Sequence, residues 1–167
     1  MAPLPFRLPP LEALLLRPRA EALSALAGAG WRRWATPIDL DAERRRLLNV
    51  DLTEPEVSWV EPGGGTLAVA HLETDLAGLA VLLEITAAVP VPAARLAEAL
   101  LPAAGEPRVG GNAEAREWVW GPEAGHRVAV GGEPVRLWVC AERAYGDRLW
   151  AVASVVRRGG GDGEADG

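Results

Sequence analysis

Apolar and polar residues alternate in four short segments of the C-terminal half, and turn-forming glycines separate the segments. They cover residues 116–120, 126–130, 135–142 and 148–156. A period of two places successive side chains on opposite faces, as in a strand with one buried face. This half of the chain is therefore predicted to form an antiparallel β-meander.

Three segments nearer the N-terminus are also predicted to be strands. Residues 56–61 and 66–73 flank a Pro-Gly-Gly-Gly turn. Residues 76–89 are ambiguous, because Leu83 belongs to a helical spacing while Ile85 belongs to a set that favours a buried strand. Periodicity alone does not separate a short buried strand from a helix, and we favour the strand.

Three helices are predicted where a proline can begin a helix. The first starts at Pro18 and stops at Gly28 or Gly30, the second covers 37–48 and ends at Asn49, and the third runs from Pro92 to about Leu101. The second has the clearest signal, the sequence Thr36-Pro37-Ile38-Asp39, with a cap, a first-turn proline and a capping-box acceptor in order. Residues 11–17 are left open between a short helix and a first strand.

These elements predict a single α+β domain over residues 1–157. An antiparallel sheet of five to seven strands packs against two or three helices, and the C-terminal strands form a β-meander. Residues 158–167 are predicted to be a disordered tail, because they are acidic, rich in glycine and free of large apolar side chains.

The last two predicted strands can be aligned residue by residue. The alignment assumes a loop at Ala144-Tyr145-Gly146, with Gly146 in the left-handed conformation. One face then pairs apolar residues throughout, namely Val135 with Val155, Leu137 with Ala153, Val139 with Ala151 and Ala141 with Leu149. The other face pairs Arg136 with Ser154, Trp138 with Val152, Cys140 with Trp150 and Glu142 with Arg148. A shift by one residue would mix the two faces, so we expect this register.

The mixed face of this hairpin is the candidate binding surface. Trp118 and Trp120 share a face of an earlier strand, and a curved sheet would bring all these indoles to one concave surface. The candidate ligand- or partner-binding residues are Trp118, Trp120, Arg136, Trp138, Cys140, Glu142, Arg148 and Trp150. The alternative stays open that a helix covers this face and the tryptophans are core residues, as buried large aromatics usually are.

Composition excludes several classes of site. The chain has 167 residues, a net charge of −6 and no lysine, which removes P-loops and Schiff-base chemistry. The single cysteine, Cys140, excludes an intrachain disulfide and the zinc sites built on several cysteines. The abundance of alanine, glycine, arginine, proline and leucine is typical of a bacterial protein from a G+C-rich genome.

The N-terminal sequence MAPLPFRLPP places prolines where a signal peptide needs an apolar helix. The chain also has no apolar run of about 18 residues, the length that spans a bilayer. We therefore expect a cytoplasmic protein with no membrane partner.

Two sets of residues that are scattered along the chain are candidates for a metal site and for a catalytic nucleophile with its base. His71, Glu73 and His126 could supply three metal ligands, but nothing in their spacing brings them together. Cys140 with His126 or Glu142 could supply a nucleophile and a base, but a cysteine in the middle of a strand usually acts as a small apolar residue. We expect no metal and no cofactor, and we lean against an enzyme.

Three functions remain after these exclusions. The first is a non-catalytic accessory protein that binds a protein partner, or a second copy of itself, on the tryptophan-bearing face. The second is a binder of a small anionic metabolite, or an enzyme acting on one, with a Trp/Arg-lined pocket. The third is a single-stranded nucleic-acid binder that uses the N-terminal arginines, Arg32–Arg33 and Arg44–Arg46. The acidic body of the chain argues against this as the main role.

Overall fold

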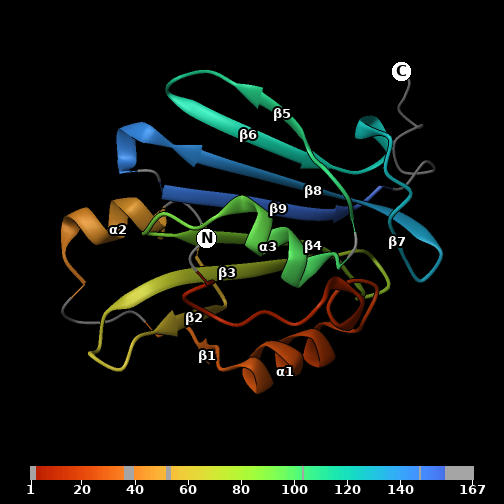
Figure 1. The fold of residues 1–167 in the computed structure, drawn as a ribbon. Helices are drawn as coiled ribbons and strands as arrows, with labels where there is room; N and C mark the ends of the chain where they lie inside the picture. Colours follow the sequence, from red (N-terminus) through yellow and green to blue (C-terminus); the bar gives the residue numbers. More distant parts are fainter. Residues whose placement is uncertain (1–2, 36–39, 52–53, 103, 147, 157–167) are drawn as a thin grey trace.

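The computed structural model describes residues 3–35, 40–51, 54–102, 104–146 and 148–156. The described part contains three α-helices and a nine-stranded antiparallel sheet (Figure 1), which confirms the α+β class. The α-helices are α1 (Arg19–Ala29), α2 (Ala42–Leu48) and α3 (Ala93–Leu100). Three short 3-10 helices are η1 (Leu11–Ala13), η2 (Pro122–Ala124) and η3 (Arg143–Tyr145).

The strands run in the spatial order β1-β2-β3-β4-β9-β8-β6-β5, and β7 pairs with β8 beside this path. Their bounds are β1 (Arg32–Arg33), β2 (Val57–Val60), β3 (Thr66–Thr74), β4 (Ala80–Ala87), β5 (Arg108–Gly111), β6 (Ala115–Trp120), β7 (Ala129–Val130), β8 (Glu133–Glu142) and β9 (Arg148–Val155). The pairing of β4 with β9 joins the N-terminal strands to the predicted C-terminal meander.

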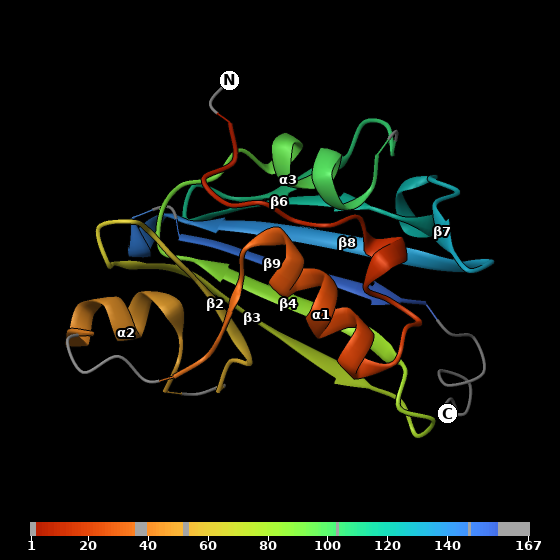
Figure 2. The same ribbon diagram turned by 90° about the horizontal axis from the view of Figure 1, so that it is seen from below.

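The helices divide between the two sides of the sheet. Figure 2 shows α3 on one side and α2 on the other. Leu26 of α1 packs on the same side of the sheet as α3, where the strands contribute Leu137 and Val139. All three side chains are fully buried. We call this side the core face, because burial of its apolar side chains supplies the main driving force for folding.

The helix predictions hold for α1 and α3 and fail in part for α2. Pro18 and Pro92 are the N-caps of α1 and α3, and Gly30 ends α1 with a φ of 115°. Helix α2 begins only at Ala42, since the side chain of Asp41 caps it by accepting a hydrogen bond from the Arg44 N–H at 2.7 Å. The predicted start at Thr36–Asp39 lies outside the described residues, and Asn49 ends the helix as expected.

The strand predictions are confirmed for the seven segments, although β7 is reduced to two residues. The ambiguous segment 76–89 contains a strand, β4, while residues 11–17 begin with the 3-10 helix η1. Two strands were not predicted, β1 and β5, so the sheet exceeds the expected number. Both are exposed edge strands, so their sequences lack the alternation of buried and exposed residues that predicts a strand.

The register predicted for the last hairpin is confirmed at every pair from Val135–Val155 to Glu142–Arg148. Gly146 has a φ of 67°, the left-handed conformation that the predicted loop requires. The apolar side of the hairpin belongs to the core face. The mixed side therefore faces away from α1 and α3.

The predicted tail at 158–167 lies outside the described residues. None of the helices in the described part of the chain combines the length and the apolar character that crossing a lipid bilayer requires.

Candidate functional site

The second side of the sheet carries a patch of half-buried side chains that α2 covers only at one end. We call this patch the tryptophan face and define it by Leu82, Glu84, Glu117, Trp138, Trp150 and Val152. The register places these residues on one side, because Trp138 lies opposite Val152 and Val152 lies opposite Glu84. At that end, Leu48 of α2 lines a small cavity together with Val69, Glu84 and Thr86 of the sheet.

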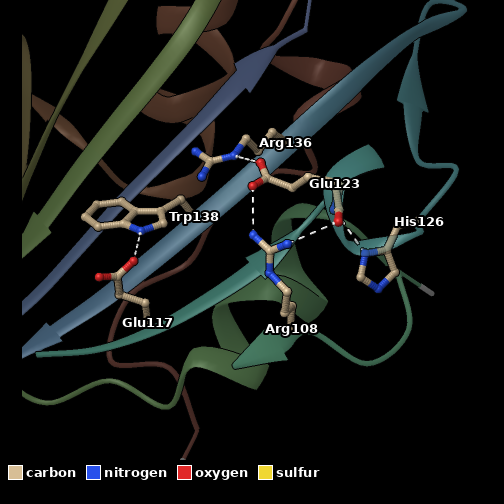
Figure 3. Close-up of polar contacts among 7 residues, drawn as sticks. Arg108, Glu117, Glu123, His126, Arg136 and Trp138 are labelled. Atoms are coloured by element: carbon tan, nitrogen blue, oxygen red, sulfur yellow. Dashed lines mark hydrogen bonds and ion pairs between the residues drawn. The ribbon is translucent and has the colours of Figure 1, made fainter. Parts of the chain in front are cut away.

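Two indoles at the centre of this face contact each other edge to face. The ring centroids of Trp138 and Trp150 are 5.1 Å apart, with an interplanar angle of 86°. Each indole N–H donates to a carboxylate of a neighbouring strand. Trp138 donates to Glu117 at 3.0 Å (Figure 3), and Trp150 donates to Glu84. The pair is therefore held in one geometry with a negative charge on each side.

A cluster of opposite charges borders the tryptophan face (Figure 3). The Glu123 carboxylate of η2 accepts hydrogen bonds from both Arg136 and Arg108, the latter at 2.9 Å. The hydrogen bond from Arg136 is the main reason that the pKa of Glu123 lies below its ordinary value, and Arg108 adds to this effect. Arg136, a predicted binding residue, is thus already engaged by a carboxylate.

Arg148 is engaged in a similar way at the other border. Its Nε and Nη2 donate to one oxygen of Glu142, at 2.9 and 2.6 Å, which confirms the predicted cross-strand ion pair. Its Nη1 donates to the carbonyls of Arg46 and Leu47, and its guanidinium lies 4.3 Å from the ring centroid of Tyr145. Arg148 therefore anchors the C-terminal end of α2 to the sheet, where a cation also complements the helix dipole.

Trp118 and Trp120 do not belong to the tryptophan face, which corrects the prediction of one surface for all four indoles. In the β6–β8 pairing, Trp118 lies opposite Val139 and Trp120 opposite Leu137, so both point to the core face. Trp120 is 2% exposed, and its indole N–H donates to the Gly105 carbonyl at 3.0 Å. For Trp120 the alternative interpretation as a core residue is correct.

Cys140 is buried between Glu117 of β6 and Trp150 of β9. Burial raises the pKa of its thiol to about 11, and the charges of Glu142 and Glu117 add to this rise. The Arg148 guanidinium acts in the opposite direction and lowers the pKa of the thiol. A thiol that stays protonated at neutral pH is a poor nucleophile.

This burial predicts slow alkylation of Cys140 by iodoacetamide. At pH 8 the shift of the pKa from 9.0 to about 11 lowers the thiolate fraction about 100-fold relative to the unfolded chain. We expect native protein to react at least that much more slowly than protein in urea, as measured by mass spectrometry. Equal alkylation rates in the two states would contradict the burial.

The same shift in pKa predicts a loss of stability at high pH. Because the thiol of the unfolded chain loses its proton first, the free energy of unfolding should fall between pH 9 and 11 more steeply in the wild type than in Cys140→Ala.

His71 lies beside Glu73 and Glu84, whereas His126 has other partners. His71 Nδ1 lies 3.3 Å from Glu84 Oε1, and its Nε2 lies 3.6 Å from Glu73 Oε2. His126 instead accepts from the Gly121 N–H at 3.0 Å through Nδ1 and contacts the Glu106 carbonyl through Nε2. No group of three residues able to ligate a metal occurs among the described residues.

The sequence analysis missed Glu84 and Glu117, the two carboxylates that flank the indole pair. A signal for Glu117 existed in the alternation of residues 115–120, where it occupies the face opposite Trp118 and Trp120. No comparable signal existed for Glu84, since its position depends on the pairing of β4 with β9.

The three arginines of α2, Arg44 to Arg46, have different partners, because consecutive residues of a helix point in directions about 100° apart. Arg44 donates to the Thr66 carbonyl, Arg45 pairs with Asp51 at 2.6 Å, and the guanidinium of Arg46 lies 5.7 Å from the ring centroid of Tyr145. They do not form a continuous basic stripe on α2.

Comparison of the chain with protein-family models, with curated protein sequences and with solved structures finds no match.

Proposed function

We propose that this protein is a non-catalytic binding protein, and that its tryptophan face binds a basic segment of a partner protein. The observation that carries the proposal is the indole pair of Trp138 and Trp150 between the carboxylates of Glu84 and Glu117. An arginine or lysine side chain of a partner would stack on an indole and pair with a carboxylate at the same time.

Charge favours a cation over an anion at this face. Arg136 and Arg148 already pair with Glu123 and Glu142, so an incoming carboxylate or phosphate would compete with bound acids. A cation would instead meet the charges of Glu84 and Glu117, and the chain as a whole carries a net charge of −6. These charges would also accelerate the association of a basic partner at low salt.

The indoles suit this role because they are both fixed and accessible. Trp138 and Trp150 are half-buried, and their N–H groups are held by hydrogen bonds. Fixed aromatic side chains lose little conformational entropy on binding and are common energetic centres of interfaces.

The test is a tryptophan-fluorescence titration with a synthetic (Arg-Ser)₄ peptide, and with (Glu-Ser)₄ as the opposite charge. We expect saturable binding of the basic peptide only. The variant Glu117→Gln should bind at least about tenfold more weakly, a change of about 1.4 kcal/mol. Glutamine still accepts the Trp138 N–H bond, so the variant removes the charge without removing the contact.

Glu98→Gln is the control, because it removes the same charge from α3 on the other side of the sheet. Glu98 is 68% exposed and pairs only with Arg95 among the described residues. Equal weakening in both variants would show a general charge effect and contradict the proposal. A homodimer by light scattering that Glu117→Gln dissociates would assign the face to a second copy and also contradict it.

A further inference from the structure

A second candidate site is a cavity between α1 and the edge of the sheet formed by β1 and β2. Its volume is about 580 Å³, which is within the range of small-molecule sites. We call it the α1 pocket. Its lining includes Leu23, Trp31, Arg33, Trp34, Glu54 and Glu56.

The α1 pocket combines an apolar wall with a rigid aromatic base. Ala20, Leu23 and Ala27 are spaced three and four residues apart, so they line one side of α1. Trp31 is 2% exposed, contacts Phe6 and Trp59 edge to face, and donates its indole N–H to the Arg7 carbonyl at 2.7 Å.

Trp34 supplies a more accessible indole to the same pocket. Its side chain is half-buried, and its backbone N–H donates to the Glu56 carbonyl at 2.8 Å. The strand edge thus holds Trp34 in place and leaves part of its ring open. Such a ring can stack against a flat aromatic ligand.

Within the described part of the chain, one guanidinium of the α1 pocket is paired and one is not. The guanidinium of Arg19 pairs with Glu56, whose second oxygen accepts from the Leu72 N–H at 2.7 Å. Arg33 lies opposite Val57, a core-face residue, and so points to the side of the sheet that α1 covers. The side chain of Arg33 makes no hydrogen bond or ion pair with any residue that the structure describes.

We propose that the α1 pocket binds a small aromatic carboxylate. The ligand's ring lies between Leu23 and Trp34, and its carboxylate forms a bidentate pair with the Arg33 guanidinium, whose planar fork matches that group. Glu54 is the remaining charged group of the lining and is exposed. The proposal is independent of the basic partner at the tryptophan face, because it rests on other residues.

The test is isothermal titration calorimetry with phenylacetate and with phenethylamine, which share a ring and carry opposite charges. We expect phenylacetate to bind and Arg33→Gln to weaken it at least about tenfold. Arg32→Gln is the control: Arg32 is the neighbouring exposed arginine, lies opposite Ser58 on the other side of the sheet, and does not line the pocket. It should leave the affinity within about twofold of the wild type.

A steric variant gives an independent readout of the same cavity. Ser24 is an exposed helical residue, so Ser24→Leu should fold normally while its larger side chain occupies the pocket and weakens phenylacetate binding. Three results would each overturn the proposal: no binding at millimolar phenylacetate, phenethylamine binding at least as tightly, or equal effects of Arg32→Gln and Arg33→Gln. Binding of (Arg-Ser)₄ should not change in Arg33→Gln, which separates this test from that of the proposed function.

Discussion

Replacing Trp120 with alanine is expected to lower the free energy of unfolding by about 3–5 kcal/mol, the usual cost of removing a large buried aromatic side chain. Trp120 is 2% exposed, and its indole N–H holds the Gly105 carbonyl. The substitution leaves a cavity in the core face and one unpaired carbonyl. Urea unfolding followed by far-UV circular dichroism measures the loss.

Trp138→Ala is the comparison that distinguishes the two faces. Trp138 is half-buried and packs on Trp150 at the surface of the sheet. We expect a loss of about 1–2 kcal/mol together with weaker binding of (Arg-Ser)₄. A loss as large as that of Trp120→Ala would show that Trp138 serves the core, and would remove the physical basis of the proposed function.

Replacing Leu83 with alanine is expected to destabilise the protein by about 2–5 kcal/mol. Leu83 is 1% exposed and lies opposite Leu72 and Ala153 in the centre of the core face. Its neighbours on the two adjoining strands, β3 and β9, cannot collapse fully into the space that it leaves. For a domain of this length, the change corresponds to a fall in the melting temperature of about 2–4 °C per kcal/mol.

Leu82→Ala is the control for this prediction, because it removes the same atoms one position earlier in the same strand. Leu82 is half-buried on the tryptophan face and lies opposite Ser154. We expect a loss below about 1 kcal/mol, since solvent already reaches the side chain and fills the space. Similar losses at Leu82 and Leu83 would contradict the assignment of one buried and one accessible side to this sheet.

The candidate site was predictable only where local pairing defines it. The hairpin of β8 and β9 was aligned correctly, including the Glu142–Arg148 pair, because both strands alternate and a short loop joins them. Trp118 was placed on the wrong surface, because its side depends on how β6 pairs with β8 across an intervening segment. The spacing of residues in the sequence does not predict the α1 pocket.

The sequence by itself determined the secondary structure of most segments, the α+β class and the register of the last hairpin. These depend on the period of the side chains, on prolines and glycines, and on contacts between neighbours in the chain. Only the tertiary structure decided which carboxylates flank the indoles, which tryptophans are buried, and where α1 leaves a cavity against the sheet edge. Those features join residues such as Glu84 and Trp150, which are 66 positions apart. A one-residue change in strand pairing reverses the side of every residue that follows, so no local pattern specifies them.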